Sequence, residues 1–126
     1  MKLSTFLSIV AVMALLFGIG FVADPAEMLA PYGMPVDRHT AFMARFLGEE
    51  LIAVGCILWL ARKTTDPMAR RAIVVAGVIS DVIALVIALQ AQLSGLVNAL
   101  GWSTVVIYAV FTVAFMYYLF AAKDSD

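Results

Sequence analysis

Residues 72–93 read AIVVAGVISDVIALVIALQAQL, an apolar run with a single ionisable residue, Asp81. The hydrocarbon core of a bilayer is ~30 Å thick, and an α-helix crosses it with ~20 consecutive apolar residues. The run therefore predicts a membrane-spanning helix. Further apolar runs of similar length occupy residues 3–23, 41–61 and 100–122.

The composition of the whole chain supports the same interpretation. Its 126 residues are 64% hydrophobic and 13% charged, whereas a soluble domain carries about 25% charged residues. Backbone groups in lipid must form their hydrogen bonds internally, so four such runs imply four helices. We predict an all-α integral membrane protein whose residues 1–126 form a single four-transmembrane-helix bundle.

The basic residues in the short loops predict how this bundle is oriented, because Lys and Arg stay on the cytoplasmic side of a membrane. Arg38 falls on one face. The residues that fall together on the other face are Lys2, Arg62, Lys63, Arg70, Arg71 and Lys123. The bias predicts that both termini lie in the cytoplasm.

The first outer loop carries a helix-start signature. In Asp24-Pro25-Ala26-Glu27 an N-cap residue is followed by proline at the first helical position and by Glu two residues later. A short helix should begin there, end at Pro31-Tyr32-Gly33 and lie along the outer membrane surface. Asp37 or Thr40 can then cap the second span.

Ionisable residues inside the spans need an explanation, since each costs roughly 2.5–3.5 kcal/mol to insert. Arg45 and Glu49 lie four residues apart on one helical face and can pair, whereas Glu50 points elsewhere. Counting ~1.5 Å per residue puts Glu49 ~12 Å below the outer end of its span and Asp81 ~13–14 Å above the inner end of the next. With Gln92 on the same helix as Asp81, these residues form the predicted intramembrane polar cluster.

Two interpretations of this cluster follow. Three carboxylates against one arginine favour protonated acids, a cation or a water-filled cavity, as in a proton- or cation-handling site. Alternatively the role is structural, with Arg45 paired to Glu49, Asp81 bonded to a neighbouring helix and Glu50 at a subunit interface. The acids could also lie higher, in an outer vestibule.

Small residues at helical intervals predict close packing of the helix backbones. They are Ala14 and Gly18 in the first span and Ala44, Gly48 and Gly55 in the second. Cys56, beside them, is interpreted as a small core residue.

Several function classes lack support in the sequence. The net charge of −1 gives no basic field for nucleic acid. Cys56 and His39, the single residues of their types, cannot build a metal site. No catalytic motif such as a phosphate-binding glycine loop is present, so an enzyme is not indicated. Whether a lipid, quinone or pigment binds is left open.

Three short strings suggest a family. Ala44-Arg45-Phe46-Leu47-Gly48, with Pro31-Tyr32-Gly33 before it and Gly101-Trp102 opening the last span, resembles the small four-helix bacterial membrane proteins called DoxX-like. Some members are named as membrane subunits of quinone-linked oxidoreductase assemblies. The resemblance implies a bacterial inner (plasma) membrane protein with an accessory role.

The leading hypothesis is therefore an inner-membrane accessory or interaction subunit, packed against itself or a larger membrane complex through its small-residue faces. The alternative is a dimeric proton-coupled transporter of small molecules. It would use Glu49, Glu50 and Asp81 as proton sites, with Arg45 as their counter-charge.

Overall fold

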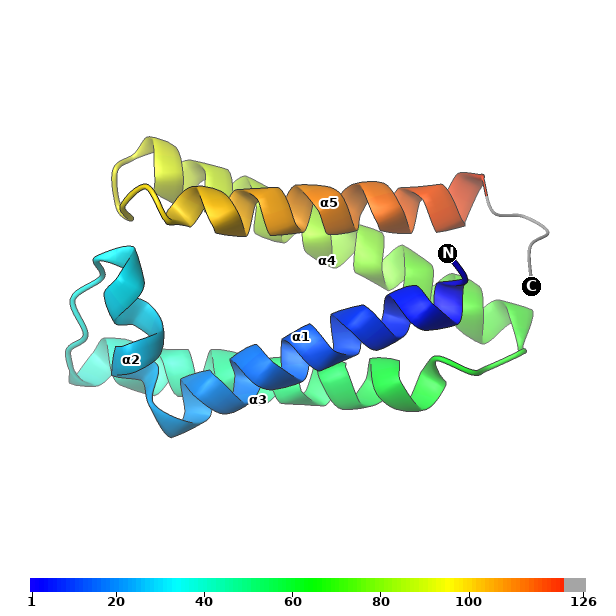
Figure 1. Ribbon diagram of the computed structural model, residues 1–126, viewed down its shortest axis with the longest axis horizontal. Coiled ribbons are helices and arrows are strands. Elements are labelled where there is room, and N and C mark those ends of the chain that lie inside the picture. The colour runs from blue at the N-terminus through cyan, green and yellow to red at the C-terminus, as the bar shows by residue number, and fades with distance from the viewer. Residues whose placement is uncertain (122–126) are drawn as a thin grey trace. The chain divides into compact units, whose positions relative to one another are not determined.

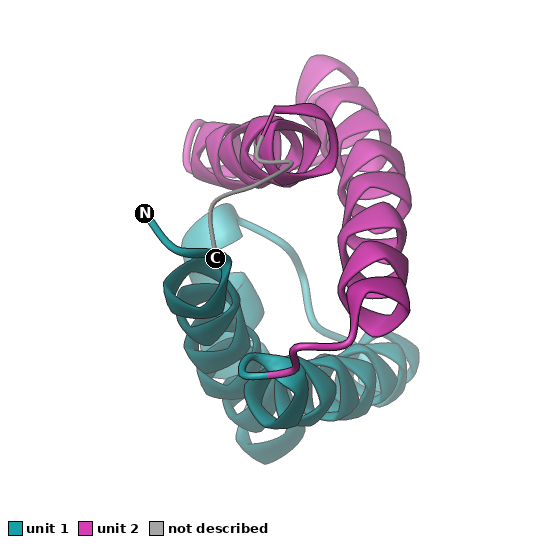
Figure 2. Ribbon diagram, turned by 90° about the vertical axis from the view of Figure 1, so that its right-hand side faces the viewer, with its two compact units in different colours: residues 1–63 teal, residues 64–126 magenta. Residues whose placement is uncertain are grey.

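The computed structural model describes residues 1–121, and 83% of this range is helical, with no strand. The elements are α1 (Leu3–Ala23), α2 (Pro25–Leu29), the 3-10 turn η1 (Ala30–Tyr32), α3 (Arg38–Ala61), α4 (Pro67–Leu93) and α5 (Gly101–Phe120) (Figure 1). They form two compact units, residues 1–63 and residues 64–126 (Figure 2), which are described separately below. Lys123 and the predicted end of the last span at residue 122 lie outside the described residues.

Three of the described helices, α1, α4 and α5, are long and apolar enough to cross a membrane. The chain thus has the helices of a multi-pass membrane protein. Helix α3 is as long but fails the same criterion, because Arg45, Glu49 and Glu50 all fall within its apolar part.

In the first unit, α1 and α3 form an antiparallel pair held at glycines. A Cβ added to Gly18 would lie 2.7 Å from the carbonyl oxygen of Gly48, and one added to Gly48 would lie 2.7 Å from the carbonyl oxygen of Gly18. Further along, Gly55 faces Leu15 and the carbonyl oxygen of Ala11. The two backbones therefore touch directly, which confirms the predicted small-residue packing.

Aspartate side chains cap the starts of α2 and α3. Asp24 Oδ1 accepts from the Glu27 backbone N–H at 3.1 Å, and α2 begins there as predicted. The turn after it ends at Gly33, whose φ of 72° favours glycine. Asp37 Oδ1 accepts from the Thr40 N–H at 2.7 Å. Because Asp37 is the cap, α3 begins at residue 38 rather than at the predicted 41.

The second unit is an antiparallel pair of α4 and α5. Asp66 Oδ1 accepts from the Ala69 N–H at 2.6 Å, so α4 starts at Pro67, five residues before the apolar run that revealed it. Gly77 packs under the ring of Phe115, where an added Cβ would lie 2.7 Å from ring atoms. At the other end of the pair, Gly101 lies against the side chain of Gln92.

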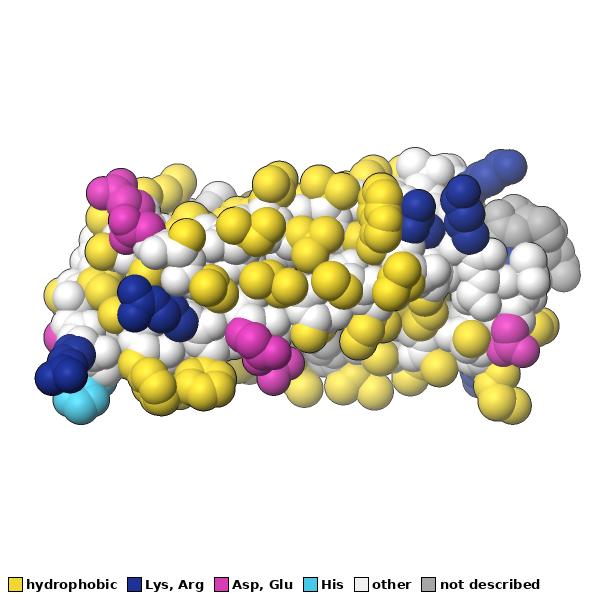
Figure 3. Space-filling view, turned by 90° about the horizontal axis from the view of Figure 1, so that it is seen from below, with side chains coloured by type: hydrophobic (Ala, Val, Ile, Leu, Met, Phe, Trp, Pro, Cys, Tyr) yellow, Lys and Arg dark blue, Asp and Glu magenta, His cyan; other side chains and the backbone are white. Residues whose placement is uncertain are grey.

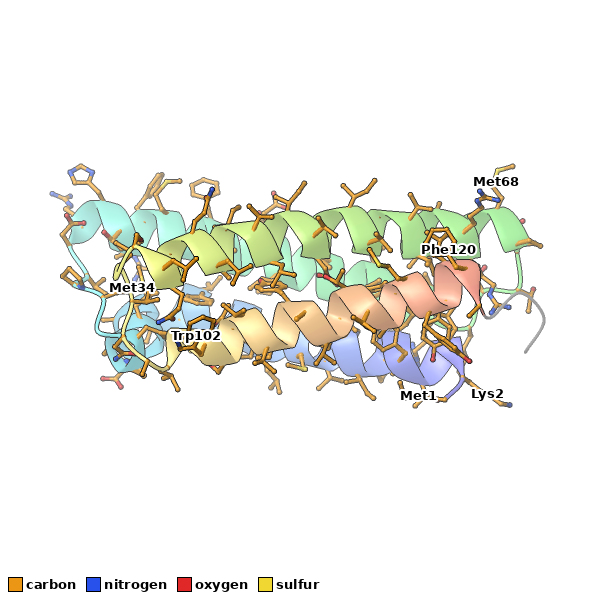
Figure 4. The ribbon with its side chains drawn as sticks, turned by 90° about the horizontal axis from the view of Figure 1, so that it is seen from above. Met1, Lys2, Met34, Met68, Trp102 and Phe120 are labelled. Atoms are coloured by element: carbon orange, nitrogen blue, oxygen red, sulfur yellow. The ribbon has the colours of Figure 1, made fainter. Side chains whose placement is uncertain are left out.

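Aromatic side chains stand near both ends of α5. Trp102 lies in its first turn and Phe120 ends the helix, and both are exposed (Figure 4). Tyr117 and Tyr118 pack edge to face near Phe120, with ring centroids 5.4 Å apart. Aromatic residues at both ends of an apolar helix are typical of the two membrane interfaces.

Candidate functional site

Arg45 joins the ends of α1 and α3. Its Nε donates to the backbone carbonyl of Val22 at 3.3 Å. Val22 lies in the last turn of α1, where carbonyl groups have no partner within the helix and favour a cation. No ion pair links Arg45 to Glu49 in the described part of the chain, and the guanidinium instead donates to this carbonyl of α1.

Glu49 and Glu50 are both exposed on α3. Gly48, the residue before them, is buried against α1, so the two acids lie on the flanks of α3 that face away from α1. Among described residues, neither acid has a hydrogen bond or an ion pair. They lie about one helical turn further along α3 than Arg45, at the level of Gly18 in α1.

The surface around these acids is apolar. Phe46 is 55% exposed and Ile57 is 60% exposed, and Phe42 and Leu60 extend the same face of α3 toward its two ends. Cys56 is also exposed on α3, so its predicted place in the core is wrong. Figure 3 shows acidic and basic side chains between hydrophobic ones on one face of the molecule.

An open hollow lies near the start of α3, lined by Arg38, His39, Phe42 and Arg45. Two arginines give it a positive character. It contains no carboxylate, and the described residues include no group of His, Cys, Asp and Glu that could hold a metal ion. The hollow continues the exposed α3 face toward the loop that precedes α3.

Among the described residues of the second unit, the buried polar ones are Asp81 and Thr112, with 9% and 7% exposure. Their atoms Oδ2 and Oγ1 have no hydrogen-bond partner, which is rare for buried polar atoms. The antiparallel register that opposes Gly77 to Phe115 also opposes Asp81 to Thr112, one turn further along both helices. The contact between α4 and α5, here called the α4/α5 seam, therefore contains two buried polar side chains between otherwise apolar helices.

The predicted cluster is divided between the units. Arg45, Glu49 and Glu50 lie on α3, and Asp81 and Gln92 lie on α4. Gln92 is eleven residues from Asp81, about 16 Å along the helix, so these two do not share a level. Gln92 Oε1 is buried without a partner near the start of α5. That the α3 acids meet Asp81 stays a prediction.

Some of these contacts had no clear signal in the sequence. A backbone carbonyl such as that of Val22 has no residue signature, and Thr112 is one of two threonines in its span. Arg62 stacks on Trp59 with 3.7 Å between its guanidinium carbon and the ring centroid. An Arg three residues after a Trp at the end of an apolar helix could have suggested that stacking.

Comparison of the chain with protein-family models, curated proteins and solved structures gives no match. The functional argument therefore rests on the geometry of α3 and of the α4/α5 seam.

Proposed function

We propose that the protein is a small accessory subunit of the bacterial inner membrane that binds another protein through the exposed face of α3. The observation that carries the proposal is the exposure of Arg45, Glu49 and Glu50 in the middle of an apolar helix surface. Lipid would cover these groups at a cost of roughly 2.5–3.5 kcal/mol each. A protein partner offering opposite charge or hydrogen bonds removes most of that cost.

The proposal includes α3 as a fourth span, despite its charges. The support is its packing along α1: Gly48 meets Gly18, and Gly55 meets Ala11 two turns further on. A helix that follows a spanning helix over this length shares its depth in the bilayer. The resemblance to DoxX-like proteins points the same way.

Both termini are proposed to face the cytoplasm, with α2 on the outer surface. A membrane-impermeant maleimide applied to intact cells tests this with single cysteines in a Cys56→Ser background. Ala26→Cys, in α2, should react at once, and Thr65→Cys, between α3 and α4, only after the cells are opened. The reverse pattern would contradict the orientation. Equal reaction at both positions in intact cells would show that α3 does not cross the membrane.

The binding surface differs from the one expected from the sequence. The small-residue faces of α1 and α3 pack against each other at Gly18 and Gly48 and are not available to a partner. We therefore place the partner on the opposite face of α3, around Phe46 and the two acids.

A photo-crosslinking amino acid, p-benzoylphenylalanine, tests whether protein covers that face. Placed at Phe46 in native membranes, it should give an adduct larger than the 13.6 kDa chain. The matched control is Val113 on α5, which is 68% exposed and should give no protein adduct. Failure to form an adduct at position 46, or equal adducts at both positions, would contradict the proposal.

A proton-coupled transporter is the second candidate, and the buried pair Asp81 and Thr112 favours it. A carboxyl with no partner inside a helix pair can bind and release a proton without breaking a salt bridge. Dicyclohexylcarbodiimide modifies protonated carboxyls in apolar surroundings, so we expect it to label Asp81 and the labelling to fall as the pH is raised. Labelling independent of pH, or equal labelling of Asp66 at the exposed start of α4, would contradict a proton site.

A further inference from the structure

We propose that the partner on α3 is a second copy of this chain, with the two α3 helices packed in parallel around a two-fold axis. The inference rests on the proposed function, since it requires that protein covers this face. Two copies inserted in the same orientation are related by an axis along the membrane normal, and such an axis makes equivalent helices parallel.

The exposed face of α3 has the seven-residue repeat of a helix pair. Its central positions form two series, each with a spacing of seven residues. The first contains Phe42, Glu49 and Cys56, and the second contains Phe46, Ala53 and Leu60. The residues of α3 that pack against α1 lie mostly on the other side of the helix, and they include Ala44, Gly48, Ile52, Gly55 and Leu58. Helix α3 thus has two seams on opposite sides, and α1 occupies only one.

Charges flank the free seam at the spacing that a parallel pair requires. Arg45 precedes the central Phe46, and Glu50 follows the central Glu49. In a parallel pair, the residue just before a central position of the Phe46 series faces the residue five positions further along the other helix. Arg45 of each copy therefore faces Glu50 of the other, and the two pairs are equivalent by symmetry.

The hydrogen bond of Arg45 to Val22 prepares it for this role. The bond uses Nε alone and anchors the guanidinium near the edge of the seam. Both Nη groups remain to donate to a carboxylate. Glu50 of the second copy lies deeper in the membrane, and its side chain leans toward its own helix N-terminus, toward the level of Arg45.

Glu49 falls on the axis beside Glu49 of the second copy. Two carboxyl groups side by side can hydrogen-bond to each other when at least one of them carries a proton. The two Arg45 side chains balance the two Glu50 carboxylates. Ala53 and Cys56 are small, which lets the helices approach closely below this level.

Cys56, the single cysteine, tests the arrangement directly because it lies at a central position. Copper phenanthroline oxidation in native membranes should convert the chain to a disulfide-linked dimer that reductant reverses, since the two Cα atoms come within about 7 Å. The control is Cys56→Ser with Val54→Cys, which moves the thiol around α3 at nearly the same depth. We expect at least about ten-fold slower dimer formation there. Equal rates, or no dimer through Cys56, would overturn the proposal.

Charge exchange tests the flanking pairs. Arg45→Glu should lower the yield of the Cys56-linked dimer about ten-fold, because buried like charges then face each other. Adding Glu50→Arg should restore it, although the bond to Val22 is lost in both variants, so recovery also shows that the unit folds. Arg38→Glu makes the same change where the opposite residue would be Met43, and should have little effect. Failure of the double variant to recover dimer would overturn the pairing.

The adduct at Phe46 separates this inference from the proposed function. An adduct of twice the chain mass supports both. An adduct of another mass keeps the accessory role but overturns the second copy as occupant. No adduct overturns both.

Discussion

The two units are both antiparallel helix pairs, yet they place their polar groups on opposite sides. In the first, the helices close on glycines and the charges of Arg45, Glu49 and Glu50 lie outside. In the second, Asp81 and Thr112 lie inside. Around Asp81 the exposed residues of α4 are apolar apart from Ser80, and they include Ile79, Val82, Ile83, Val86 and Ile87.

This difference teaches what each surface is suited to contact. An apolar outer face can meet lipid at no electrostatic cost, whereas a face with three charges cannot. The contacts between the helices differ too. The α1/α3 contact closes on glycines and apolar side chains, whereas the α4/α5 contact contains buried polar atoms without a hydrogen-bond partner. Substitutions in the two seams should therefore have effects of different size and sign.

The largest expected effect is that of Gly18→Ala. The added Cβ would lie 2.7 Å from the carbonyl oxygen of Gly48 and 2.9 Å from the Ile52 nitrogen, so backbone must move. We expect the unfolding free energy in mixed micelles to fall by about 3 kcal/mol. Gly20→Ala, two residues away, meets only the flexible Met28 side chain and should cost under about 1 kcal/mol. Equal losses would mean that α1 and α3 do not touch as described.

Gly77→Ala should have a smaller effect in the second unit. Its Cβ meets the outer edge of the Phe115 ring, which can shift more easily than backbone. A loss of about 1–2 kcal/mol in the same titration is expected. Phe115→Leu should recover part of the loss in the double variant, and strict additivity of the two changes would contradict the contact.

Thr112→Val should change stability in the opposite direction. Its hydroxyl is buried without a partner, so an apolar group of the same shape should leave stability unchanged or raise it by up to about 1 kcal/mol. Thr104→Val on the same helix is the control for the change of residue type. A clear loss of stability specific to position 112 would show that the hydroxyl makes a hydrogen bond. The contrast between the interiors of the two units would then be smaller than described.

The smallest effect is expected at Asp37, outside the helices' apolar parts. The N–H and side chain of Thr40 donate to its carboxylate and lower its pKa below the ordinary 3.8. A lowered pKa means that the ionised cap stabilises the fold above about pH 3.8 and that this contribution is lost as the pH falls below it. Asp37→Asn keeps a capping side chain but should reduce the loss of stability between pH 5 and pH 2, about the range where the carboxyl titrates. An unchanged acid profile would assign that dependence to other carboxyls.

The apolar runs predicted the helices, because period and length are local properties. Residues 3–23 match α1 at both ends, and the Asp24-Pro25 signature predicted α2. The starts of α3 and α4 were predicted three and five residues late, because capping by Asp37 and Asp66 extends each helix beyond the membrane-like run.

The site was harder to predict than the helices. Spacing on one helix suggested an Arg45–Glu49 pair, but the hydrogen bond goes to a carbonyl of another helix. Spacing also cannot say which flank of α3 faces α1, and that choice leaves Cys56, Glu49 and Glu50 exposed. Such choices depend on contacts between distant segments, here the meeting of Gly18 with Gly48.

The glycine contact between α1 and α3 also bears on how the protein is made. A segment with Arg45, Glu49 and Glu50 at its centre is a poor substrate for the insertion machinery by itself, whereas α1 is apolar throughout. We expect α1 to enter the bilayer first and α3 to follow as the second arm of a helical hairpin. Deleting α1, or replacing Gly48 with a larger residue, should then leave α3 accessible to protease in newly made protein, while α4 and α5 still insert.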